Sequence, residues 1–211
     1  DDRTDIAAMA TISTISQPLR GEFIRTAATA GAVVYQVDAR LPALIPVFFA
    51  GQLSAVRLCA VMALVSGTWS SLTGLPDEPE NGEAALPVSP ETEYQRRRYT
   101  LTLQNGRSGE RVESVLTEAS SRLRGDLLRN LIITGLALHT TAPELPRLLA
   151  SMPVPPTSVS ELQALVQQMA GTADVNRAAA AVPDTPAASA APVSGADTRE
   201  IKKNMRRAFG D

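Results

Sequence analysis

Two residue types that build many catalytic and metal sites are almost missing from this chain of 211 residues. It has one cysteine, Cys59, and one histidine, His139. A single cysteine excludes an intramolecular disulfide and a multi-cysteine metal site, and a single histidine excludes a histidine cluster. Cys59 lies within an apolar run, which predicts a buried thiol. His139 follows an apolar run, which predicts a histidine at the end of a helix. No glycine-rich phosphate motif is present. We therefore expect no catalytic residue, no cofactor and no metal, and so a protein that is not an enzyme.

Aromatic residues are also scarce, at 4% of the chain, although hydrophobic residues make up 44%. The core must then be built from alanine, leucine, valine and isoleucine, which suits closely packed helices and predicts a mainly α fold. The net charge is −2, so overall electrostatics favour no particular partner. Arginine supplies 18 of the 20 basic residues, which fits either GC-rich coding or a use for bidentate donors.

The most apolar stretch, residues 41–69, lacks the pattern of a membrane span. A spanning helix needs about 20 apolar residues, but Pro42 and Pro46 interrupt the start and Arg57 sits in the middle. We expect one or two buried helices here, with a bend or close contact at Gly51.

Two short segments show the alternation of a β-strand. Residues 32–38 fit a strand, and they equally fit a helix continuing from Glu22; we favour the strand. Residues 98–104 also alternate, and Asn105-Gly106 is a hairpin-turn signal. A small β element over 32–38 and 98–104 is therefore expected beside the helices. Between the two segments, residues 73–90 are rich in proline and acidic residues and predict an exposed loop that divides the body.

The second half of the body shows helical patterns. Residues 108–139 carry apolar residues at three- and four-residue steps, and Gly125 and Gly135 permit a close crossing or a break. Those apolar positions are Val112, Leu116, Ala119, Leu123, Leu127 and Leu131. A further helix is expected over Ser158–Gly171, with a capping box at its start and a glycine stop at its end.

Beyond this helix the composition changes. Residues 172–196 are mostly alanine and proline, which predicts a linker arm without a core of its own. Residues 197–211 then have helix capping signals and hold the only two lysines. We expect a basic amphipathic docking helix at the end of an extended C-terminal arm, after a helical body spanning residues 1–171. Its partner-binding stripe would be Ile201, Met205 and Phe209, with Ala208 as the alternative third position.

Two clusters of basic residues suit an anionic partner such as nucleic acid. The first, Arg96, Arg97 and Arg98, lies between two tyrosines, although charges on an edge strand also deter sheet association. The second lies in the terminal segment and comprises Arg199, Lys202, Lys203, Arg206 and Arg207.

These observations predict a non-enzymatic assembly subunit of a larger complex, such as a virion coat, nucleocapsid or filament, held to its neighbours by the C-terminal arm. Its partners would be further copies of itself or other protein subunits. The alternatives are a protein that coats RNA or DNA through the arginine clusters and, less favoured, a peripheral membrane protein. No signal peptide or full membrane span is visible, so an intracellular or virion location is expected.

Overall fold

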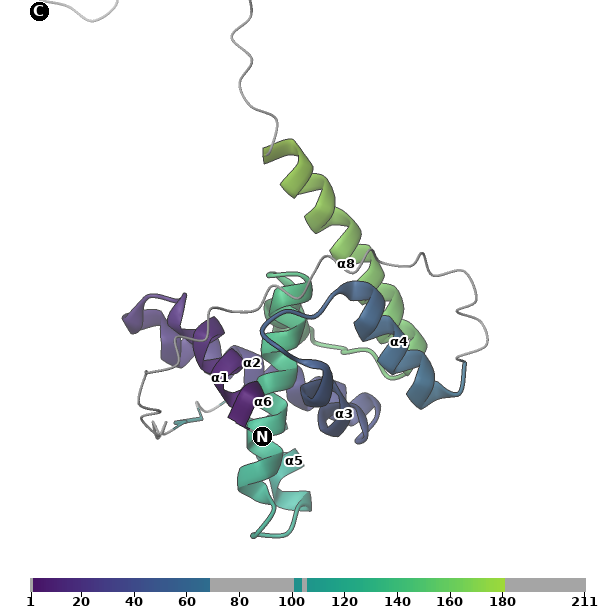
Figure 1. The fold of residues 1–211 in the computed structure, drawn as a ribbon. Helices are drawn as coiled ribbons and strands as arrows, with labels where there is room; N and C mark the ends of the chain where they lie inside the picture. Colours follow the sequence, from purple (N-terminus) through teal and green to yellow (C-terminus); the bar gives the residue numbers. More distant parts are fainter. Residues whose placement is uncertain (1, 69–100, 104–105, 181–211) are drawn as a thin grey trace, which may run out of the picture. The chain divides into compact units, whose positions relative to one another are not determined.

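The computed structural model describes residues 2–68, 101–103 and 106–180, which fold into helices with no strand among them (Figure 1). The mainly α prediction is therefore confirmed. The α-helices are α1 (Asp2–Ser13), α2 (Arg20–Val37), α3 (Leu41–Phe48), α4 (Ala55–Ser66), α5 (Arg107–Glu118), α6 (Arg124–Thr141), α7 (Leu145–Ser151) and α8 (Val159–Ala180), with a 3-10 turn at Gln17–Leu19.

The most extensive contact joins α2 and α6, and two glycines make it close. A β-carbon at Gly31 would collide with the backbone of Leu131, and one at Gly135 would collide with the backbone of Ala27. The alanines of α2 extend this small-residue surface. The distance between two packed helices depends on the side chains at their contact. Small residues allow a close approach here, whereas aromatic side chains would hold the helices apart.

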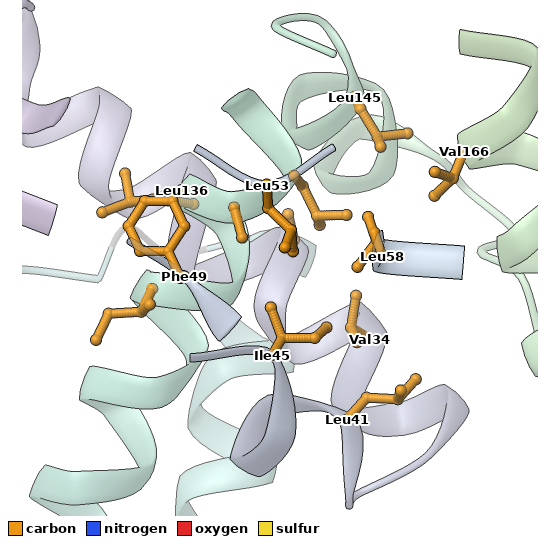
Figure 2. Packing of buried hydrophobic residues seen from close by; sticks show 14 of the residues in the cluster. Val34, Leu41, Ile45, Phe49, Leu53, Leu58, Leu136, Leu145 and Val166 are labelled. Carbon is orange, nitrogen blue, oxygen red and sulfur yellow. The ribbon is translucent and has the colours of Figure 1, made fainter. Parts of the chain in front are cut away.

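The main hydrophobic cluster gathers side chains from seven of the helices, among them Val34 of α2, Leu58 of α4 and Leu136 of α6. Leu41 and Ile45 of α3, and Phe49 just beyond it, point into this cluster at four-residue steps (Figure 2). A smaller cluster packs α5 on α2 and α6 and contains Ala28, Ala32, Val112, Val115 and Leu131. These aliphatic clusters are the core that the composition predicts.

Polar contacts join segments that are distant in the sequence. The N–H of Leu53, between α3 and α4, donates to the hydroxyl of Thr140 (3.3 Å), and the hydroxyl of Thr141 donates to the Leu53 carbonyl (2.8 Å). Both threonines lie in the last turn of α6. At the other side of the fold, Arg129 of α6 pairs with Asp5 of α1 at 2.7 Å.

The predicted strand at residues 32–38 is wrong. These residues continue α2, which runs to Val37, so the helical alternative holds. Other helices cover α2 on several sides, and three consecutive residues, Ala32, Val33 and Val34, are all buried. The segment therefore lacks the polar positions that mark one side of a surface helix. Residues 101–103 form no strand either, and the rest of the predicted 98–104 segment lies outside the described residues.

The helix predicted over residues 108–139 is interrupted. The chain forms α5 and α6 with a turn at residues 119–123, just before Gly125. Leu123, placed on the apolar stripe by the sequence, is 58% exposed at this turn. Val112 and Leu131 are fully buried as predicted, and the close crossing occurs at Gly135.

The start of α8 is confirmed and its end is not. The Glu161 N–H donates to the Ser158 hydroxyl (3.2 Å), and the Glu161 carboxylate accepts the N–H of Thr157 (2.8 Å). The hydrogen bond from the Thr157 N–H is the main reason why the pKa of Glu161 is lowered. The helix does not stop at Gly171 but continues to Ala180, because an alanine-rich sequence favours the helix more than one glycine disfavours it.

Residues 41–68 form two helices, α3 and α4, as expected, with positive φ at Gly51 where the chain bends between them. No helix in the described ranges is long and apolar enough to cross a membrane. Contacts divide the chain into two units, residues 1–176 and 177–211, and only residues 177–180 of the second are described. The predicted division into body, linker arm and docking helix stays a prediction.

Candidate protein interface on helix α3

Helix α3 has an exposed apolar face. All eight of its residues are apolar, and Leu41 and Ile45 fill the inner side. On the outer side, Val47 is 73% exposed and Phe48 is 47% exposed. Ala43, one turn before Val47, and Ala50, just beyond the helix, are also exposed. These four residues, Ala43, Val47, Phe48 and Ala50, are called the α3 face below.

Local backbone chemistry fixes the position of this face. Pro42 lies in the first turn, where proline is favoured. Pro46 lies inside the helix and has no N–H for the preceding turn. Its carbonyl accepts the buried hydroxyl of Thr4 of α1 (3.3 Å) and the N–H of Phe49 (3.2 Å). The chain leaves the helical conformation at Phe49, whose side chain turns into the core.

Arg40 links the beginning of α3 to the end of α4. The Arg40 guanidinium binds the Asp38 carboxylate (Nε–Oδ1 3.0 Å, Nη2–Oδ2 2.7 Å) and also donates to the carbonyl of Val65 (2.9 Å). The hydrogen bond from Arg40 is the largest cause of the lowered pKa of Asp38. The Val65 carbonyl belongs to the last turn of α4, where a cation is favourable.

The α3 face offers no charged group and no hydrogen-bonding side chain. Its chemistry is therefore that of an apolar contact. Burying a valine or phenylalanine side chain in such a contact contributes about 1.5–3 kcal/mol. Aromatic residues are common anchors in protein interfaces, and Phe48 is the aromatic residue of the α3 face.

Every site residue predicted from the sequence lies outside the described residues. These are Arg96, Arg97, Arg98, Arg199, Ile201, Lys202, Lys203, Met205, Arg206, Arg207 and Phe209. The structure neither gathers nor separates them, and their roles stay predictions.

The single histidine and the single cysteine have structural surroundings. His139 contacts the Pro143 carbonyl through Nδ1 (3.1 Å) and meets the ring of Phe23 edge-on, with centroids 4.9 Å apart. Cys59 is buried, and this burial raises the pKa of its thiol, while a hydrogen bond with Gln167 opposes the rise. In the described part of the chain, no three histidine, cysteine or acidic side chains lie close enough together to hold a metal.

A shallow open hollow lies on the outer side of α5. Its lining is Glu110, Glu113, Ser114, Thr117 and Glu118. It is acidic and open to solvent, and it contains no apolar anchor.

Sequence reasoning did not find the α3 face. It predicted buried helices over residues 41–69, because apolar letters alone do not tell the core side of a helix from its outer side. One available signal is the helix length set by Pro42 and the bend at Gly51. A short surface helix cannot bury both of its sides, so a helix with no polar residue leaves an apolar side exposed.

The fold and the α3 face define a mainly helical protein that exposes one apolar helix side. Over residues 1–62 and 97–166, more than half of its length, the chain matches the family described as "Plasmid stability protein". The chain belongs to this family. Neither the curated proteins nor the solved structures gave a match.

The family match covers α3 and both glycines of the α2–α6 crossing, and it ends before the predicted C-terminal arm. It concerns plasmid stability and gives no support to the virion coat, nucleocapsid or filament that the sequence suggested.

Proposed function

We propose that this plasmid stability protein is a non-enzymatic subunit that acts by associating with further copies of itself through the α3 face. The observation that carries the proposal is the exposure of Val47 and Phe48 on a helix without any polar residue. A helix that is hydrophobic all round is normally buried, and in the single chain the outer side of α3 is not. A second protein surface would complete its burial.

A membrane surface fits this face less well. Helices that lie on anionic membranes carry lysine or arginine on their polar face, and α3 has no polar face and no charged residue. Eight residues span only about 12 Å, which gives a small apolar area for insertion. A protein partner matches both the size and the chemistry of the α3 face.

The experiment compares two valines of equal exposure. Val47 is on the α3 face and Val154, which is 75% exposed, lies in the loop after α7. The purified full chain would be measured by light scattering coupled to size exclusion over a range of concentrations. We expect the wild type and Val154→Asp to exceed the monomer mass of 22.3 kDa and Val47→Asp to remain at it. Circular dichroism would check that both variants fold.

Two results would overturn the proposal. One is a wild-type protein that stays monomeric at every concentration. The other is a Val47→Asp variant that associates as the wild type does. A retention assay extends the test to cells that carry a plasmid dependent on this protein. In that assay Val47→Asp should increase plasmid loss and Val154→Asp should not.

A second candidate function is DNA binding through Arg96, Arg97 and Arg98. The observation that favours it is that Arg97 and Arg98 fall within the segment matched by the family. Phosphate contacts make binding fall steeply with salt. Filter binding of double-stranded DNA at low and high salt, with the three arginines changed to glutamate as the comparison, tests this candidate. Binding that ignores both salt and the substitutions would contradict it.

A further inference from the structure

We infer that the α3 face of one copy receives residues 197–211 of a second copy. This inference rests on the proposed self-association and adds the identity of the occupant. The α3 face needs an apolar partner about as long as α3 itself, because Ala43, Val47 and Phe48 lie along this eight-residue helix and Ala50 lies just beyond it. On an α-helix, eight residues correspond to about 12 Å.

As a helix, the terminal segment would have an apolar stripe of that length. Ile201, Met205 and Phe209 are spaced four residues apart. On a helix they would lie on one side, separated end to end by eight residues, again about 12 Å. Ala43 and Ala50 at the ends of the α3 face are small, so large side chains such as Phe209 have room beside Val47 and Phe48. Few other stretches of the chain beyond residue 180 carry large apolar residues.

The charges of the segment agree with this arrangement. In the sequence, its basic residues lie before and between Ile201, Met205 and Phe209. Docked on a face without charge, they would lie at the rim of the contact, where polar groups keep their water. None of them would need to be buried without a partner, which would be costly.

The chain is long enough for the exchange. It continues for 31 residues after Ala180, and residues 181–196 precede the terminal segment. When fully extended, these 16 residues reach roughly 55 Å, which exceeds the span of a small domain. A segment tethered to one copy can therefore reach the α3 face of its neighbour.

Disulfide trapping in the full chain tests the occupant directly. Ala43→Cys places a thiol on the α3 face and keeps its large side chains, Val47 and Phe48. Ala208→Cys places a thiol beside Phe209 in the sequence and keeps all three apolar residues of the terminal segment. The two variants are separate proteins that are mixed. One of them carries a larger tag, so that a dimer between the two variants can be recognised by its mass. The control replaces Ala43→Cys by Ala164→Cys, an exposed alanine of α8. Native Cys59 is buried and stays in place.

After mild oxidation, the mixture of Ala43→Cys and Ala208→Cys should give roughly tenfold more mixed dimer than the Ala164→Cys control, because docking raises the local thiol concentration. Adding Val47→Asp to the Ala43→Cys chain should reduce the yield to that of the control. A yield equal to the control overturns the inference. A chain that carries both Ala43→Cys and Ala208→Cys gives a further check. If its disulfide forms only within one chain and never between two chains, the inference is also overturned.

The two proposals fail separately. If Val47→Asp abolishes association while trapping matches the control, the α3 face binds some other part of the second copy. If Val47→Asp leaves association unchanged, the proposed function itself is wrong.

Discussion

Gly135 of α6 lies so close to Ala27 of α2 that a β-carbon at position 135 would collide with the Ala27 carbonyl group. Gly31 of α2 meets the backbone of Leu131 in the same way. At these two points the helices touch backbone to backbone, so neither can accept a side chain without moving apart.

This contact predicts opposite effects for two glycines of one helix. Gly135→Ala should lower the free energy of unfolding by about 1–3 kcal/mol, the usual cost of adding volume to a packed contact. Gly125, also in α6, has open space within 4 Å of the point where a β-carbon would lie. Gly125→Ala should therefore be neutral or stabilise by up to about 1 kcal/mol through helix propensity. Urea unfolding followed by circular dichroism measures both. Equal effects would contradict the close crossing.

A buried hydroxyl of α6 leads to the second prediction. Among the described residues, the fully buried Thr134 hydroxyl has no hydrogen-bond partner, which makes its burial unfavourable. Thr134→Val keeps the shape and removes the hydroxyl, so we expect stability to rise by about 1 kcal/mol.

Thr141 in the same helix serves as the matched comparison, because its hydroxyl donates to the Leu53 carbonyl. Thr141→Val should lower stability by about 1 kcal/mol. Thermal or urea unfolding of the two variants separates them by sign. A Thr134→Val variant as destabilised as Thr141→Val would show that the Thr134 hydroxyl has a favourable contact after all.

The Asp38–Arg40 pair predicts a pH dependence. The pKa of Asp38 is lowered chiefly by the hydrogen bond from Arg40, so the folded state favours the ionised carboxyl. The stabilisation is then complete above the pKa of the unfolded carboxyl, about 3.9, and is lost as the pH falls through the lower folded value. Asp38→Asn should lower the melting temperature at pH 7.

The same variant should differ little from the wild type at pH 2–3. The test is the melting temperature of the wild type and of Asp38→Asn between pH 2 and pH 7. The same measurement in high salt should show a smaller difference between the two proteins at pH 7, because salt screens the ion pair. A difference that stays constant with pH would mean that Asp38 acts through its shape rather than its charge.

Cys59 gives a fourth prediction. Burial raises the pKa of its thiol, and the reactive thiolate forms less readily as a result. Opening a core position costs several kcal/mol. At pH 8 a thiol reagent should therefore label native Cys59 at least about a hundredfold more slowly than the urea-unfolded chain. Ala164→Cys supplies an exposed thiol as the control. Equal labelling rates for the two cysteines in the folded protein would contradict the burial of Cys59.

Composition and periodicity predicted the helical class because they report the average environment of many residues. The capping box of α8 was also predictable, since Ser158 and Glu161 act within one turn. The strand at residues 32–38 was wrong because α2 is buried on several sides at Ala32, Val33 and Val34. Burial of that kind removes the polar positions on which a helical period depends.

The break between α5 and α6 was not predictable as a fixed point, because the apolar stripe continues through Leu123 and only the tertiary fold leaves that side chain exposed. The α3 face was missed for a related reason. Val47 and Ile45 are equally apolar, and which of them meets the core depends on helices far away in the sequence. The predicted residues of the C-terminal arm lie outside the described residues, so their prediction is still open.

The two threonines at the end of α6 have a consequence for the geometry of the α3 face. Thr140 receives the Leu53 N–H and Thr141 donates to the Leu53 carbonyl, so neighbouring hydroxyls bind both polar groups of one backbone unit. If α6 slid by a single residue, this match of donor and acceptor would be lost. Thr140 and Thr141 together thus fix the position of the α3–α4 connection relative to α6. Substitutions at Thr140 or Thr141 should therefore shift α3 and weaken the proposed association, although Val47 and Phe48 themselves are unchanged.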